Sequence, residues 1–239
     1  MAEPHAAENA VPDTGSKGLS LRGLWEVFFK PTQFMTELRE RPAVLVALVV
    51  VVLLSAIFFA LMKDIIYDLQ VNTPEFQERM RGQALTPGMQ QIIKIQTVAF
   101  GVIAQVLIPL IAAALGLFWG NFVFAGKASF KQLMAVMTYG TVIATVGMLV
   151  GLPIMLAKGT MVPPFGLGIL GASQGYDSFL FTLLSKFDVF LFFELAVIGI
   201  GLSVLYNVTR SRGIVLSILS MGMLSILHVL GVGIWKLIS

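Results

Sequence analysis

The sequence lacks cysteine and is poor in charged residues, and each shortage excludes a class of protein. Without cysteine, the 239-residue chain can form no disulfide, no thiolate metal site and no cysteine nucleophile. Charged residues make up 12% of the chain, about half of the ~25% typical of soluble domains, whereas 57% of its residues are hydrophobic. So few charges cannot cover a water-facing surface, and we therefore expect lipid to be the solvent for much of the chain.

Residues that commonly carry catalysis are also scarce. The chain has two histidines, and one of them, His5, stands in a polar N-terminal segment. Neither the phosphate-binding pattern GxxxxGK[ST] nor the zinc-protease pattern HExxH occurs. We therefore expect no enzymatic activity, no metal and no cofactor. The net charge of +3 includes no lysine–arginine run of the kind that follows phosphates, so we expect no nucleic-acid binding.

The N-terminal region divides into two parts. Residues 1–18 are polar and rich in Ala, Pro and Gly, which predicts a disordered cytoplasmic tail. Residues 19–41 form an amphipathic helical region that is too short and too charged to span a membrane. Its apolar side chains recur at i, i+3, i+4 and i+7: Leu21, Leu24, Trp25 and Phe28. This face predicts a helix that lies in the membrane interface; a short helix packed on the bundle is the alternative.

The remaining residues, 42–239, predict a five-helix transmembrane domain. A helix of about 20 apolar residues crosses a ~30 Å hydrocarbon core at 1.5 Å per residue. Five segments satisfy this requirement, at about 43–62, 97–124, 133–157, 188–206 and 214–235. The fold class is therefore all-α: a polytopic membrane helical bundle with about five transmembrane helices and an N-terminal interfacial amphipathic helix. The proline- and glycine-rich segment 158–186 should lie at the interface or fold over the mouth of the bundle.

The distribution of basic residues predicts the orientation of the bundle. The loops 125–132 and 207–213 each carry two basic residues in fewer than ten positions, whereas the loops on the other side are much longer. Short basic loops stay in the cytoplasm, so we expect a cytoplasmic N-terminus and an external C-terminus.

Two GxxxG motifs fall within predicted spans. They are Gly116 with Gly120 in the second span and Gly147 with Gly151 in the third. Small residues four apart clear a groove that lets another helix approach closely. Packing within the bundle and contact with another subunit, including a homo-oligomer, are both consistent with them.

Polar residues inside the spans define a candidate polar layer. Glu194 and His228 each lie about seven residues from the external end of their predicted spans, roughly 10 Å deep, and Gln105 and Ser55 fall within a turn of that depth. Because buried polar groups seek partners, we hypothesise that Glu194 and His228 meet as an ion pair or a hydrogen-bonded pair. The pair could hold helices together, take part in proton or substrate transfer, or consist of two separately solvated residues.

Three segments resemble the bacterial Yip family, whose members share a domain named for Ypt-interacting proteins. They are LWEVFFKPTQFMTELRERP (24–42), GKASFKQLMAVMTYGTVIATVG (126–147) and KFDVFLFFELAVIGIGLSVLYN (186–207). The resemblance extends over about residues 20–235. The sequence departs from the family pattern at Glu194, where relatives often carry an aromatic residue. The resemblance implies a five-helix membrane domain without known enzymatic activity, located in a bacterial inner membrane. Its relatives act in vesicle traffic or beside ABC-type exporters.

These expectations lead to one favoured function and one alternative. We expect a non-enzymatic membrane scaffold or accessory protein that contacts membrane lipids and a protein partner in a membrane complex. The alternative is a small transporter or lipid-handling protein that uses the polar layer of Glu194 and His228.

Overall fold

The computed structural model describes residues 17–81, 83–176 and 178–238, and these residues are overwhelmingly helical. Within the described ranges the β-structure consists of one isolated antiparallel bridge between Gly166 and Asp188. The predicted all-α class is therefore confirmed. Residues 1–16 of the predicted tail lie outside the described residues, as does the side chain of Leu21.

Five helices are long and apolar enough to cross a membrane, which confirms the predicted number. The first is α3 (Leu45–Val71), and the second is α5 (Pro87–Leu117) with the π-helical segment η1 (Phe118–Val123). The third is α6 (Phe130–Lys158), and the fourth is α9 (Val189–Tyr206). The fifth runs through α10 (Arg210–Ser217), the π-helical segment η3 (Ile218–Gly222) and α11 (Met223–Ile238).

Helices α3 and α5 extend beyond the predicted spans 43–62 and 97–124. The extensions carry charged residues, and Lys94 Nζ of α5 lies 2.7 Å from Asp64 Oδ1 of α3. A charge marks the edge of the hydrocarbon layer, but it does not end a helix. Helix α5 begins instead where the Thr86 side chain accepts a hydrogen bond from Met89 N and Pro87 takes the first helical position.

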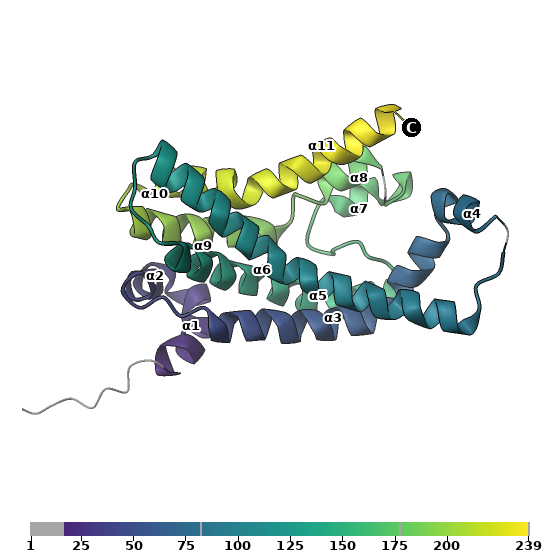
Figure 1. Cartoon of the computed structure of the whole chain (residues 1–239), viewed down its shortest axis with the longest axis horizontal. Helices are drawn as coiled ribbons and strands as arrows, with labels where there is room; N and C mark the ends of the chain where they lie inside the picture. The colour runs from purple at the N-terminus through teal and green to yellow at the C-terminus, as the bar shows by residue number, and fades with distance from the viewer. Residues whose placement is uncertain (1–16, 82, 177, 239) are drawn as a thin grey trace, which may run out of the picture.

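The bundle has two ends with different coverings (Figure 1). Helices α1 (Lys17–Phe29) and α2 (Pro31–Glu40) lie at one end, which we call the platform end. Helices α4 (Pro74–Met80), α7 (Gly168–Gly171) and α8 (Phe179–Leu184) lie at the other, which we call the loop end. The described residues between α6 and α9 lie at the loop end, which is one of the two locations expected for segment 158–186. Leu167 N donates to Phe187 O (2.9 Å) and ties this segment to the start of α9.

Helix α6 is the centre of the bundle and contacts α1, α2, α3, α5 and α9. Every residue from Leu133 to Ile143 is buried. A capping box fixes the beginning of α6, because the Ser129 side chain accepts from Gln132 N while the Gln132 side chain accepts from Ser129 N. Its end is fixed by Gly159, which takes a left-handed conformation with φ of +60°.

The two platform helices pack tightly against the bundle. Phe34, Met35 and Leu38 of α2 are almost completely buried. The Phe34 ring meets the Tyr139 ring of α6 edge-on, with 4.7 Å between centroids. Hydrogen bonds from side chains to backbone carbonyl groups add to this packing. Arg39 Nη1 donates to Val204 O (3.1 Å), and Gln132 Nε2 donates to Arg39 O (2.8 Å). The platform is thus a fixed part of the fold.

Candidate functional site

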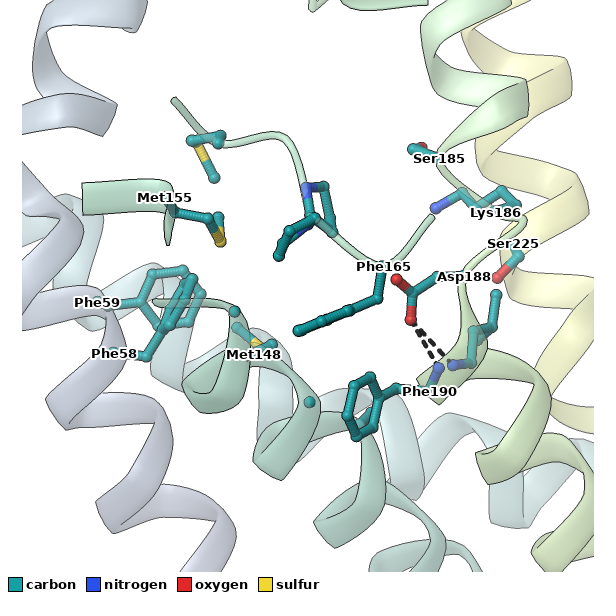
Figure 2. A pocket seen from close by; sticks show the side chains of 17 residues that line it. Phe58, Phe59, Met148, Met155, Phe165, Ser185, Lys186, Asp188, Phe190 and Ser225 are labelled. Atoms are coloured by element: carbon teal, nitrogen blue, oxygen red, sulfur yellow. Dashed lines mark hydrogen bonds between the residues drawn. The ribbon is translucent and has the colours of Figure 1, made fainter. Parts of the chain in front are cut away.

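An amphipathic pocket of about 320 Å³ lies toward the loop end of the bundle (Figure 2). Its apolar part is lined by aromatic and methionine side chains from α3, α6, α9 and the loop before α7: Phe58, Phe59, Met148, Met155, Phe165 and Phe190. Polar side chains gather at the other end of the pocket: Ser185, Lys186, Asp188 and Ser225. The volume is within the range of small-molecule sites.

A second, more polar cavity of about 360 Å³ adjoins the first. The two share Ala144, Lys186, Leu191 and Ser225. Three residues of the predicted polar layer, Gln105, Glu194 and His228, line this second cavity. Ser55 does not line it; this side chain is fully buried in α3, and its Oγ has no hydrogen-bond partner among the described residues. The structure therefore brings together three of the four residues that shared a predicted depth.

The hypothesised pair of Glu194 and His228 does not form. Among the described residues, no hydrogen bond or ion pair joins them; His228 Nδ1 instead lies 3.2 Å from Lys186 Nζ. Glu194 is 3% exposed and lines the polar cavity together with Thr141, but its Oε1 has no hydrogen-bond partner within the described part of the chain. The number of residues between a side chain and the end of its predicted span gives only its position along the bundle axis. The rotation of α11 turns His228 toward Lys186, and depth cannot predict that rotation.

Lys186 is the central site residue that the sequence analysis missed. It stands in the short connection between α8 and α9, half-buried, and lines both cavities. Burial lowers the pKa of its ammonium group, because the charged form loses hydration. None of the three ion pairs among the described residues involves it. Its position just before a predicted span was a usable signal, since it is one of only two basic residues in the long segment 158–186.

Asp188 fixes the geometry around Lys186. Its Oδ1 accepts hydrogen bonds from Phe190 N (2.8 Å) and Leu191 N (3.3 Å), so it caps the N-terminus of α9. A cap at this position holds the α8–α9 connection against the bundle. The sequence analysis assigned Asp188 no special role.

A third, more open cleft of about 650 Å³ meets the polar cavity at His228. It also contains Glu75 and Arg79 of α4, Tyr176 and Ser185. His228 therefore lines both this cleft, with the charged residues of α4, and the cavity in which Glu194 lies.

The four glycines of the GxxxG motifs all approach residues of the same chain. A Cβ atom on Gly120 would overlap the Tyr206 ring, and one on Gly147 would overlap the Phe190 ring. A Cβ atom on Gly151 would lie 3.0 Å from Pro164 Cδ, and one on Gly116 would lie 3.1 Å from Met137 Cε. These positions therefore serve close packing within the bundle.

The predicted interfacial face of α1 is split between two environments. Leu24 and Phe28 pack against the core of the bundle, as the alternative interpretation expected. Trp25 is 68% exposed, and its ring lies beside that of the exposed Phe29, tilted by 34° at a centroid distance of 4.3 Å. Glu26 is buried and lies 2.6 Å from Arg22. The helix thus uses one side to bind the bundle and presents an aromatic pair on the other.

One short motif escaped the sequence analysis. Residues 171–175 read GASQG, which matches the G-x-S-x-G pattern of serine hydrolases. That pattern requires a strand–turn–helix context. Here Ser173 is exposed in a short 3-10 segment, η2 (Ala172–Gln174), that directly follows α7. The motif therefore lacks the setting of a nucleophile. No group of three metal-ligating side chains occurs within the described ranges either.

The five membrane-length helices define the class of this molecule: it is a polytopic integral membrane protein. The family profile of the Yip1 domain matches residues 25–233, nearly the whole chain. The chain therefore belongs to the Yip1 domain family, as the resemblance of its segments predicted. No curated protein and no solved structure matches it.

Proposed function

We propose that this protein is a non-enzymatic membrane scaffold or accessory protein that binds a protein partner through its platform helices α1 and α2. The exposed aromatic pair Trp25 and Phe29 carries the proposal. Large aromatic side chains are enriched at the centres of protein interfaces, and leaving two of them uncovered in water is unfavourable. Because α2 is anchored in the core, the pair is presented in a fixed position that costs little ordering when a partner binds.

Family membership supports a role in membrane traffic or beside an ABC-type exporter, since the resemblance implies such settings. The platform faces the cytoplasm in this proposal, and the C-terminus faces outward across a bacterial inner membrane. The basic residues of the short loops at the platform end support this orientation: Lys127, Lys131, Arg210 and Arg212.

The test compares two surface pairs of similar exposure in the full-length protein. Trp25→Ala with Phe29→Ala removes the platform pair, and Leu170→Ala with Ile169→Ala removes an exposed pair on α7 at the loop end.

A photo-crosslinking side chain at position 25, with position 170 as control, identifies the contact directly. We expect one defined protein adduct from position 25, and loss of the corresponding detergent-stable complex only in the platform variant.

Two further variants separate this function from the transport or lipid-handling alternative. A scaffold tolerates Glu194→Gln and His228→Ala, or is merely destabilised by them. If both variants accumulate in the membrane but lose physiological function while the complex stays intact, the alternative is correct and the scaffold proposal is wrong. Crosslinks from position 25 that reach lipid alone would also refute it.

A further inference from the structure

Lys186 lies where the cavities of the loop end converge. Its side chain lines the amphipathic pocket and the polar cavity, and its ammonium lies 3.2 Å from His228 Nδ1, which opens onto the third cleft. No carboxylate lies within ion-pair distance of Lys186 among the described residues. Two basic nitrogen groups thus lie side by side, neither of them in an ion pair with a described residue, and a bound anion would complete such a site.

Two acidic side chains, Asp188 and Glu194, line these cavities, and neither forms an ion pair with Lys186. Asp188 uses Oδ1 to cap α9, where the helix N-terminus stabilises its negative charge. Glu194 lies in the polar cavity beside Thr141 and forms no ion pair with Lys186. Glu75 lies in the open cleft, which Arg79 also lines. The positive charge of Lys186 thus remains available to a ligand.

The apolar part of the amphipathic pocket suits an alkyl chain. The whole pocket, including its polar end, measures about 320 Å³, so its apolar part holds a segment of an alkyl chain and not a complete acyl chain. Methionine and phenylalanine side chains line this part, and flexible methionines adapt their shape to apolar ligands. The walls are the membrane-length helices α3, α6 and α9, so membrane lipid is the amphiphile that surrounds the pocket.

We infer that this site binds an anionic membrane lipid, with its phosphate on Lys186 and His228 and a segment of one acyl chain in the phenylalanine–methionine pocket. Figure 2 shows the arrangement that this requires, with Lys186 and Ser225 at one end and Phe58, Phe59 and Met155 at the other. The inference is independent of the platform and of its partner.

Native mass spectrometry of the full-length protein released from lipid nanodiscs tests the site. The discs contain either phosphatidylglycerol, which is anionic, or phosphatidylcholine, which is zwitterionic. We expect the wild type to retain one phosphatidylglycerol and little phosphatidylcholine. Lys186→Gln should reduce phosphatidylglycerol retention about tenfold, because one charge-assisted hydrogen bond is lost. Phosphatidylglycerol retention by Lys186→Arg should stay within about threefold of that by the wild type. Lys158→Gln is the matched control, since Lys158 is an exposed lysine at the same end that lines none of these cavities.

Two more variants test the chain pocket and guard against misfolding. Ala144→Met narrows the junction of the two cavities and should reduce retention of phosphatidylglycerol. Ser225→Asp keeps Lys186 but places a carboxylate in the same cavities, so it should compete with the phosphate even if Lys186→Gln fails to accumulate.

Several results would overturn the inference. Equal retention of both lipids by the wild type would remove the role of charge. Lys158→Gln losing as much lipid as Lys186→Gln would indicate binding to the surface in general. Unchanged retention in both Ala144→Met and Ser225→Asp would place the lipid elsewhere. A final arm adds decanoate to delipidated protein: if decanoate binds one to one and phosphatidylglycerol does not, the ligand is a free acid and the assignment to a membrane lipid is wrong.

Discussion

Replacing Glu194 by methionine tests whether this carboxyl group is retained for stability. The side chain is 3% exposed, and its Oε1 has no hydrogen-bond partner in the described part of the chain. An unpaired buried polar atom costs about 1–3 kcal/mol, whereas one ordinary hydrogen bond made by the other carboxyl oxygen would contribute about 0.5–1.5 kcal/mol. Methionine is similar in length to glutamate, and it removes both the cost of the unpaired oxygen and the gain from the hydrogen bond. We therefore expect Glu194→Met to raise the free energy of unfolding by about 1 kcal/mol.

The assay is thermal unfolding of the purified protein in mild detergent, followed by the loss of the monodisperse species. For a chain of about 150–250 residues, 1 kcal/mol corresponds to a midpoint shift of about 2–4 °C. Glu194→Gln is the control, because the amide keeps the shape and the hydrogen-bonding capacity of the side chain; its midpoint should stay close to that of the wild type. A fall of more than about 2 °C in Glu194→Met would refute the reasoning, since it would mean that the carboxyl group is satisfied and holds the helices together.

Four other substitutions test packing and an ion pair of the bundle by the same assay. Phe34→Ala should lower the free energy of unfolding by about 3–5 kcal/mol, because this ring is fully buried between the platform and α6. Gly120→Ala should lower it by about 1–3 kcal/mol, since the new methyl group overlaps the Tyr206 ring; Gly88→Ala, which meets open space, should not lower it. Lys94→Gln should leave the midpoint unchanged, because its ion pair lies at the surface, and a clear fall would show that the pair stabilises the extended helix ends.

The membrane-spanning helices were predictable from the sequence because lipid imposes a simple rule. A segment that crosses the hydrocarbon core must be long and nearly free of charge, and residues 43–62 satisfy that rule without any knowledge of their neighbours. Helix ends obey a different rule, since capping and proline decide them. Helix α5 therefore begins at Pro87, ten residues before the apolar stretch that revealed it. The sequence contained this signal as well, in the run Thr86-Pro87-Gly88.

The candidate site was predictable only in part, because depth and rotation are separate coordinates. Glu194, His228 and Gln105 share a depth and line one cavity. The contact that organises the cavity, however, joins His228 to Lys186 across 42 positions in sequence. Lys186 belongs to a connection that no helical periodicity describes, so its direction depends on how α8 and the Asp188 cap fold over the bundle. Tertiary packing supplies that information, and local sequence does not.

The long polar side chains at the two ends of the bundle differ in their hydrogen bonding, and this difference indicates different roles for the two ends. At the platform end, Arg39 and Gln132 donate to backbone carbonyl groups that join α2 to α9 and to α6. Such bonds hold helices in place and leave little capacity for a ligand. Toward the loop end, the one described polar group within hydrogen-bonding distance of the Lys186 ammonium is His228 Nδ1, and one oxygen of Glu194 has no described partner. Because unpaired buried polar groups lower stability, a bundle that served only to support the platform would be more stable with apolar residues there. Their presence therefore favours a ligand at the loop end, in addition to a partner at the platform.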